Sequence, residues 1–318
     1  MPRHPQICIS FPMRAVKRFD AWMGDHEFAE IGQLIEELGF DAVSVAEHPY
    51  PPDAWLANGG HHALDPFVAL SAWSAVTHRI TLMTAILVAG YRSPYLLAKS
   101  ASSLDFISGG RVVLGMGAGY LKEEFEVLGA DFAGRGKVLD AAIPAMRSAW
   151  AGEDFEDDRF PAVAHTALPL PKQAGGPPIW VGGNSAAARR RVVNTVEGWL
   201  PIAQNETMAA ITRTPALTSL DDLAEQVADV NARRAALDRA PADVAFTPFE
   251  SALLRRGSME DYCRVLVPQL DGYAAAGITW LTIEPTSRTF DAFREDLTVL
   301  ASCLGVGHGG RVSTKHNI

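Results

Sequence analysis

The feature that most restricts the fold is an alternation of short apolar strands and helical segments along almost the whole chain. Candidate strands recur at 6–11, 40–46, 80–88, 111–115, 178–181, 198–202, 244–247 and 278–283. Between them, apolar residues fall at helical spacing, notably over 26–38, 95–107, 220–237, 259–276 and 290–304. The strands are apolar on both faces, as parallel strands covered by helices are. About eight strands, each followed by a helix, predict a (β/α)₈ TIM barrel with loop insertions.

A doubly wound dinucleotide-binding sheet is the alternative fold, and its glycine motif is weak in this chain. Gly115, Gly117 and Gly119 give G-x-G-x-G rather than G-x-G-x-x-G, and they follow the fourth strand instead of the first. Barrels of this type exceed 250 residues in one unit, so we expect one domain over 1–306. The Asp-, Pro- and Gly-rich stretch 153–177 is predicted to be a loop insertion, and 307–318 a flexible tail.

Charge and composition exclude several classes of partner. The net charge of −9 disfavours nucleic acid and anionic membranes, because phosphates would be repelled overall. The longest apolar run, 82–89, is too short to cross a bilayer, and the N-terminus lacks the apolar core of a signal peptide. Cys8, Cys263 and Cys303 are far apart and lack C-x-x-C spacing, so neither a disulfide framework nor a metal site is expected. A cytoplasmic protein is predicted.

In a barrel of this kind the active site lies at the carboxyl ends of the strands. The second strand is followed by Glu47 and His48, and the fourth by Gly117, Gly119 and Tyr120. His48 is the strongest catalytic candidate, since imidazole exchanges a proton near neutral pH; the alternative is a solvated loop histidine. Glu47 is a second candidate, although adjacent strand residues point to opposite sides.

A small-residue turn after the fifth strand resembles an anion site. Gly182, Gly183, Asn184 and Ser185 open a helix, and the bare amides at a helix N-terminus bind phosphate well. That helix carries three successive arginines at 189–191, which fan around its circumference. At least two of them are therefore expected to face solvent.

The motifs, taken in order, resemble the luciferase-like monooxygenase family, most closely its branch that uses the deazaflavin coenzyme F420. The resemblance is dense over 6–202 and looser beyond. It is carried by Leu38-Gly39-Phe40-Asp41, Glu47-His48, Leu64-Asp65-Pro66, Leu97-Ala98-Lys99, Ser108-Gly109-Gly110-Arg111, Leu114-Gly115-Met116-Gly117-Ala118-Gly119, Glu123-Glu124-Phe125 and Pro178-Ile179-Trp180-Val181-Gly182-Gly183.

The resemblance implies a barrel with its cofactor in the mouth, a small-molecule substrate and a homodimer. His48 corresponds to a family histidine near the reactive part of the ring. Ala85-Ile86 matches a position in the third strand where many members have a non-prolyl cis peptide behind the ring. The implied cofactor-binding set is His48, Ala85, Ile86, Gly117, Ala118, Gly119, Gly182, Gly183 and Asn184, and the implied catalytic set is His48, Glu47 and Tyr120.

Two departures from the family pattern bear on function. Tyr120 stands where some deazaflavin dehydrogenases have a proton-donating glutamate, and a phenol of ordinary pKa near 10 is a weaker acid, which disfavours sugar-phosphate chemistry. The stretch 195–199 also differs from the usual Leu-Gly-Asp-Gly-Trp. The leading hypothesis is an F420-dependent oxidoreductase that moves a hydride to or from a small organic substrate. The alternatives are an FMN-dependent monooxygenase and a cofactor-binding protein without turnover.

Overall fold

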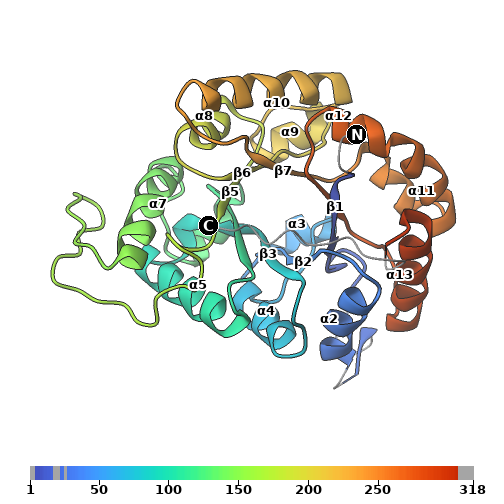
Figure 1. Cartoon of the computed structure of the whole chain (residues 1–318), viewed down its shortest axis with the longest axis horizontal. Coiled ribbons are helices and arrows are strands. Elements are labelled where there is room, and N and C mark those ends of the chain that lie inside the picture. Colours follow the sequence, from blue (N-terminus) through green and yellow to red (C-terminus); the bar gives the residue numbers. More distant parts are fainter. Residues whose placement is uncertain (1–3, 17–21, 25–26, 307–318) are drawn as a thin grey trace.

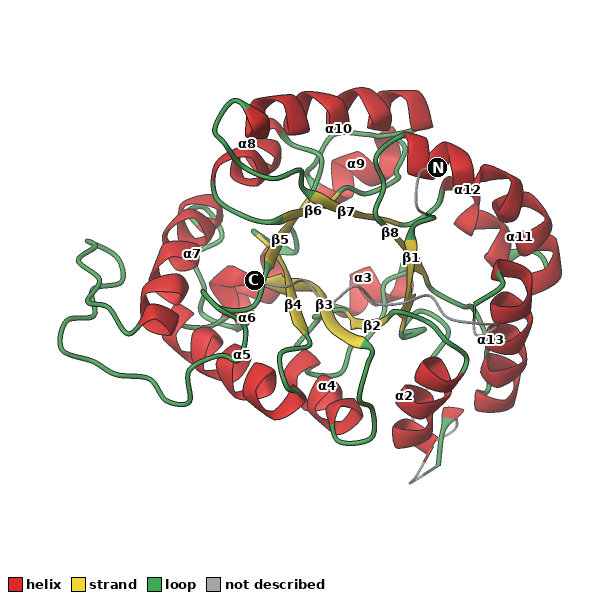
Figure 2. Cartoon of the chain, in the orientation of Figure 1, coloured by secondary structure: helices red, strands yellow, loops and turns green. Residues whose placement is uncertain are grey.

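Eight parallel strands close into a barrel in sequence order in the computed structural model of this chain, which describes residues 4–16, 22–24 and 27–306 (Figure 2). The ring closes where Ile9 of the first strand pairs with Ile283 of the last. This confirms the predicted (β/α)₈ barrel and excludes the doubly wound sheet. The strands are β1 (Gln6–Ser10), β2 (Ala42–Val45), β3 (Thr81–Val88), β4 (Val112–Gly117), β5 (Ile179–Gly182), β6 (Gly198–Leu200), β7 (Asp243–Phe246) and β8 (Trp280–Ile283).

The interior of the barrel is filled by one side-chain cluster to which every strand contributes. Two large residues, Trp180 and Trp280, meet edge to face with ring centroids 5.8 Å apart. Small side chains from other strands leave room for them, as close packing requires. The full cluster is Cys8, Ala42, Met83, Val113, Trp180, Leu200, Ala245 and Trp280. Side chains therefore fill the space enclosed by the strands, and a ligand site can form only at an end of the barrel.

Helices surround the barrel and bury the outer faces of the strands (Figure 1). The helices of the described chain, including the short α3, α6 and α9 in the loops, are α2 (Glu27–Glu37), α3 (Asp53–Ala57), α4 (Pro66–Ser74), α5 (Pro94–Ser108), α6 (Lys122–Val127), α7 (Arg135–Ala151), α8 (Ala186–Asn194), α9 (Glu206–Thr212), α10 (Leu220–Ala235), α11 (Met259–Leu266), α12 (Leu270–Ala275) and α13 (Phe290–Leu304). Short 3₁₀ turns are η1 (Ala89–Tyr91), η2 (Phe249–Arg255) and η3 (Val267–Gln269).

Local sequence signals set several helix boundaries as expected. The Asp65 carboxylate accepts hydrogen bonds from the amides of Phe67 and Val68, 2.9 and 3.1 Å away, and so caps α4. One prediction was too long: the helix expected over 259–276 is divided into α11, η3 and α12. Pro268 lies at the division, because proline lacks an N–H and its ring clashes with the preceding turn of a helix.

The two long irregular segments differ in their relation to the barrel mouth. The 47–64 segment contains the short helix α3 and reaches the cavity described below. The insertion at 153–177 extends away from the ring of helices (Figure 1). The tail predicted at 307–318, and the first residue of the helix predicted over 26–38, lie outside the described residues. Within the described part of the chain, every helix is too short or too polar to cross a membrane.

Replacing Gly115 with alanine is expected to lower the free energy of unfolding by about 1–3 kcal/mol. A Cβ there would lie 2.1 Å from the backbone oxygen of Thr84 on β3, which cannot move aside without disturbing the strand. Urea unfolding measures the change. The control is Gly272→Ala in α12, where the added carbon makes an ordinary 3.5 Å contact with Leu220 and is expected to be neutral or stabilising. Equal stability of the Gly115 variant and the wild type would contradict this close approach of the two strands.

Candidate active site

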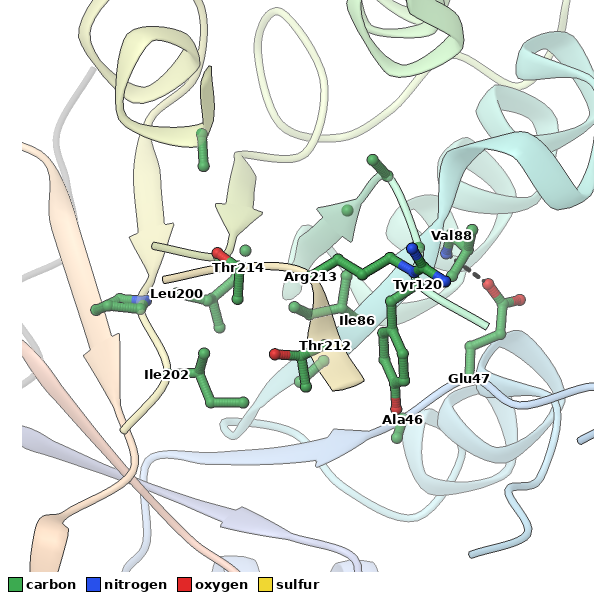
Figure 3. Close-up of a pocket in the computed structure, with 18 of the residues that line it drawn as sticks. Ala46, Glu47, Ile86, Val88, Tyr120, Leu200, Ile202, Thr212, Arg213 and Thr214 are labelled. Atoms are coloured by element: carbon green, nitrogen blue, oxygen red, sulfur yellow. Dashed lines mark hydrogen bonds between the residues drawn. The ribbon is translucent and has the colours of Figure 1, made fainter. Parts of the chain in front are cut away.

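A cavity of about 620 Å³ lies at the carboxyl ends of the strands, and its wall is built from the end of β3 and from the segment that follows each of the other strands. Figure 3 shows part of this wall, with side chains from several segments converging on one space. One lining residue from each successive segment is Phe11, His48, Ile86, Gly119, Gly183, Pro201, Thr247 and Glu284. None of the residues of the 153–177 insertion lines it.

One face of the cavity is formed by the end of β3 and by glycines of the neighbouring strands. The peptide bond between Ala85 and Ile86 is cis, as the family resemblance implies. A Cβ on Gly182 would lie 2.1 Å from Cδ1 of Ile86, and one on Gly117 would lie 3.1 Å from its Cγ2. Glycine at both positions therefore makes room for the Ile86 side chain, which packs against them and lines the cavity. The structure thus brings four of the predicted cofactor-binding residues together.

His48 forms a polar pair with a fully buried carboxylate that the candidate set did not include. Its Nδ1 lies 3.2 Å from Oε2 of Glu124. The Tyr91 hydroxyl donates to the same oxygen at 2.8 Å, and the Tyr50 amide donates to Oε1 at 3.0 Å. Because Nδ1 is held by Glu124, Nε2 is the ring nitrogen of His48 that can exchange a proton with a ligand in the cavity.

The surroundings of Glu124 keep it ionised. Burial by itself raises the pKa of this carboxyl, but the hydrogen bonds from His48, Tyr91 and Tyr50 outweigh it, and the net pKa lies below the ordinary value. A carboxylate only accepts hydrogen bonds, so Nδ1 of His48 carries a proton at this contact. Glu124 therefore fixes both the orientation and the tautomer of the imidazole.

Glu47 is buried beside the cavity and makes structural bonds. Its Oε1 lies 2.6 Å from a guanidinium nitrogen of Arg92, and its Oε2 accepts a 2.7 Å hydrogen bond from the Val88 amide (Figure 3). Burial raises the pKa of Glu47, and the charge of Arg92 opposes this. These contacts tie the end of β2 to the end of β3. We therefore assign Glu47 to positioning its neighbour His48 rather than to proton transfer.

An aromatic cluster surrounds the His48 ring. The ring centroids of Trp55, His61 and Tyr120 lie 4.5, 5.0 and 6.1 Å from that of His48. Burial, and next the charge of His48, lower the pKa of His61 to about 4, so His61 is neutral at pH 7. Burial is the main cause that raises the pKa of Tyr120 to about 12, with a smaller contribution from Glu124. Tyr120 is thus a hydrogen-bond donor here and a weaker acid than an ordinary tyrosine.

Glu284 is a further cavity-lining carboxyl that the sequence reasoning missed. It directly follows β8, and its Oε1 accepts a 3.3 Å hydrogen bond from the Arg14 amide. Burial raises the pKa of Glu284 despite the opposing charges of Arg14 and Arg255. The only signal in the sequence is its position after the last strand, because no motif surrounds it.

The turn that opens α8 also borders the cavity, but one of its predicted binding residues serves a different purpose. Gly182, Gly183 and Ser185 line the cavity, and Asn184 lies behind them, 1% exposed. The Asn184 side-chain nitrogen donates to the carbonyls of Ile202 and Pro215 at 2.9 and 2.8 Å, and its Oδ1 accepts from the Ile202 amide at 2.9 Å. Its own amide donates to Thr214 Oγ1 at 2.7 Å. Asn184 therefore holds the turn in place and has no polar group left for a ligand.

The three arginines of α8 point in different directions, but the expectation that at least two of them face solvent is wrong, because Arg189 is half-buried and Arg191 is buried. Arg191 reaches the cavity wall, where Asp140 binds it at 2.6 and 3.2 Å. Arg189 donates to the Asn184 carbonyl and to Gln226. Arg190 is exposed. Three other cavity-lining arginines, Arg14, Arg135 and Arg213, come from segments where no site was predicted.

The altered 195–199 stretch is explained by local packing. The Glu197 carboxylate accepts a 2.9 Å hydrogen bond from the Ile179 amide at the start of β5 and a 2.7 Å bond from Arg147. Both contacts lie outside the cavity lining. The departure from the family pattern at this point is therefore accommodated by contacts to β5 and α7.

Comparison with curated proteins finds relatives that include dehydrogenases. The protein Rv0940c of Mycobacterium tuberculosis (strain ATCC 25618 / H37Rv) is 34% identical over 168 residues, 52% of this chain and 57% of the relative. An F420-dependent glucose-6-phosphate dehydrogenase of Microbacterium testaceum (strain StLB037) is 31% identical over 199 residues, 60% of this chain and 57% of the relative. The chain thus matches less than two thirds of the length of these relatives.

Among solved structures, the monooxygenase RslO1 of Streptomyces bottropensis covers 94% of this chain and 98% of its own, with a TM-score of 0.71 and 18% identity. The coenzyme F420-dependent tetrahydromethanopterin reductase of Methanopyrus kandleri gives the same coverage, with a TM-score of 0.64 and 13% identity. At these identities the likeness concerns the fold alone.

The family model described as luciferase-like monooxygenase matches residues 17–260. With its closed barrel and the expected cis peptide after Ala85, the chain belongs to the luciferase-like monooxygenase family.

Proposed function

We propose that the protein is an F420-dependent oxidoreductase that transfers a hydride between the deazaflavin and a small organic substrate. The observation that carries the proposal is the joining of three features in one cavity. These are the His48–Glu124 pair, the apolar Ile86 side chain seated on two glycines, and a wall that combines arginines with the glycine turn before α8. Relatives named as F420-dependent dehydrogenases support the choice of cofactor.

The residues of the cavity fit a flat ring that carries a phosphate. Side chains at Gly117 and Gly182 would displace Ile86, so glycine at both positions keeps Ile86 on the cavity wall as an apolar face against which a planar ring can lie. For the phosphate, backbone amides in the first turn of α8 can bind an anion. One amide of this turn, that of Ala188, already donates a 3.1 Å hydrogen bond to Ser185 Oγ. We assign the ring to the Ile86 face and the phosphate to the turn at Gly183 and Ser185.

The bound deazaflavin supplies the hydride chemistry, and the chain supplies binding, orientation and proton exchange. His48 donates or accepts a proton through Nε2 at the reacting oxygen of the substrate. Glu124 stabilises the imidazole when it is positive and keeps its ring fixed. Tyr120 donates a hydrogen bond from its neutral hydroxyl. The Glu47–Arg92 ion pair fixes the strand end that carries His48, and Trp55 packs against the imidazole and excludes water.

Titration of the ligand-free protein with F420 and, separately, with FMN tests the proposal, with fluorescence as the readout. We expect saturable F420 binding at least tenfold tighter than FMN binding. Tight FMN binding without F420 binding would replace the proposal with FMN-dependent oxygen chemistry. Binding of neither ligand would reject both cofactors and leave a role without this chemistry.

A further inference from the structure

A second polar part of the cavity wall lies across the barrel from the glycine turn. Glu284 directly follows β8, Arg14 follows β1 and His48 follows β2, and these three strands are consecutive in the ring. In a ring of eight strands in sequence order, β1 lies opposite β5, the strand that leads into the glycine turn. The end of β3, with Ile86, lies between the two parts of the wall. Space for a second small molecule is therefore bordered by Glu284, Arg14 and His48.

Glu284 and Arg14 have hydrogen-bonding capacity that the described residues leave unused. Glu284 Oε1 accepts a 3.3 Å hydrogen bond from the Arg14 amide, and Oε2 accepts none. The Arg14 side chain is exposed, and its guanidinium forms no hydrogen bond or ion pair with the described residues. Polar groups on the wall of a cavity usually have partners. Oε2 of Glu284 and the guanidinium of Arg14 are thus available to a ligand.

The charge of Arg14 acts on three ionisable groups around it. Burial raises the pKa of Glu284, and burial raises that of Tyr120 to about 12; Arg14 opposes both shifts. Burial is the main cause that lowers the pKa of His61 to about 4, and Arg14 contributes to this decrease. Arg14 therefore lies within electrostatic reach of Glu284 and of the aromatic cluster around His48. A small molecule can contact both.

The chemistry of the two side chains favours a carboxylate as the ligand. A guanidinium keeps its charge and presents a planar set of N–H donors that matches the two oxygens of a carboxylate. The other charge that acts on Glu284 is that of Arg255, which does not line the cavity. Since burial opposes ionisation of Glu284, its carboxyl can donate a hydrogen bond to a carboxylate, which only accepts.

We propose that Arg14 and Glu284 bind a carboxylate of the substrate, so that a neighbouring hydroxyl or carbonyl oxygen meets Nε2 of His48. The substrate class is then a small hydroxy acid or the corresponding oxo acid. This inference rests on the proposed function and deepens it by naming the substrate. In the direction of oxidation, the carbon that bears the hydroxyl loses its hydrogen as a hydride to the deazaflavin. The hydroxyl proton passes to His48, and a C=O bond forms.

The test uses the F420-loaded protein and two matched pairs of probes, lactate with 1,2-propanediol and 3-hydroxybutyrate with 1,3-butanediol. In each pair a hydroxymethyl group replaces the carboxylate. Calorimetry measures binding, and the loss of F420 absorbance measures turnover. In at least one pair we expect the hydroxy acid to bind about tenfold tighter than the diol. Arg14→Gln should remove most of this difference and change diol binding less than twofold, since hydrogen bonds to charged groups contribute on that scale.

Glu284→Gln separates a hydrogen-bonding role from a structural one. The amide still donates, so affinity for the hydroxy acid at pH 7 should change less than threefold. In the wild type this affinity should fall as the pH rises, because ionised Glu284 repels the carboxylate, whereas the Gln variant should show no such fall. The same pH profile for both proteins would remove Glu284 from the site.

Arg288→Gln is the matched control, since it removes the same charge from an exposed residue of the segment after β8 that does not line the cavity. It should leave all affinities unchanged. Equal binding of hydroxy acids and diols to the wild type, or an equal loss of both in Arg14→Gln, would overturn the carboxylate site while F420 binding still supported the proposed function. Absence of F420 binding would overturn both.

Discussion

Replacing His48 with alanine is expected to lower the turnover number about 10²- to 10⁴-fold, the range that a positioned acid–base group contributes. Nε2 of His48 is the ring nitrogen free to face a ligand, since Glu124 holds Nδ1 at 3.2 Å. Loss of the imidazole removes proton exchange at the reacting oxygen and leaves the Ile86 face and the glycine turn intact. The affinity for F420 should therefore change less than threefold, which a fluorescence titration beside steady-state kinetics measures.

His62→Ala is the control for this variant. His62 is exposed, and its contact with His61 involves only its backbone carbonyl. The control should keep wild-type turnover and affinity. Turnover of His48→Ala equal to that of His62→Ala would remove His48 from the mechanism, whereas loss of F420 affinity in parallel with turnover would make it a binding residue instead.

Replacing Asn184 with alanine is expected to lower the free energy of unfolding by about 3–5 kcal/mol. The substitution removes the partner of the Ile202 amide and of the carbonyls of Ile202 and Pro215. The Pro215 carbonyl keeps a 3.1 Å hydrogen bond from Gln204, so the Ile202 amide and carbonyl are the two groups left without a partner, and each costs about 1–3 kcal/mol. Asn184→Asp should also destabilise the protein, because a carboxylate cannot donate to the two carbonyls. Urea unfolding curves measure both effects.

Asn194→Ala, ten residues along the same chain segment, is the matched control. The Asn194 side chain is exposed and donates one hydrogen bond to the Arg190 carbonyl within α8. A change of about 0.5 kcal/mol or less is expected there. If Asn184→Ala were as stable as this control but lost phosphate-bearing ligands, Asn184 would be a binding residue, as the sequence first suggested, and its structural assignment would fail.

Strand positions could be predicted because their apolar runs are local and are bounded by clear turn signals. The bounds differ by at most two residues for most strands, for example 80–88 against Thr81–Val88. The division of the helix expected over 259–276 could also have been found, since Pro268 stands inside it. The short helices α3, α6 and α9 are too brief to produce a distinct helical periodicity, and their stability comes from packing.

The sequence by itself determined the barrel fold and the end of the barrel at which a site can form. It also identified His48, Ile86 and the neighbouring glycines as candidate site residues. These follow from periodicity, from the rule that parallel strands end at one edge, and from motif order. Only the tertiary structure decided which groups act together. Glu124 lies 76 residues beyond His48, so no local pattern joins them. Closure of the ring of strands brings their loops together, and hydrogen bonds and charges across that space then separate the binding roles from the structural ones.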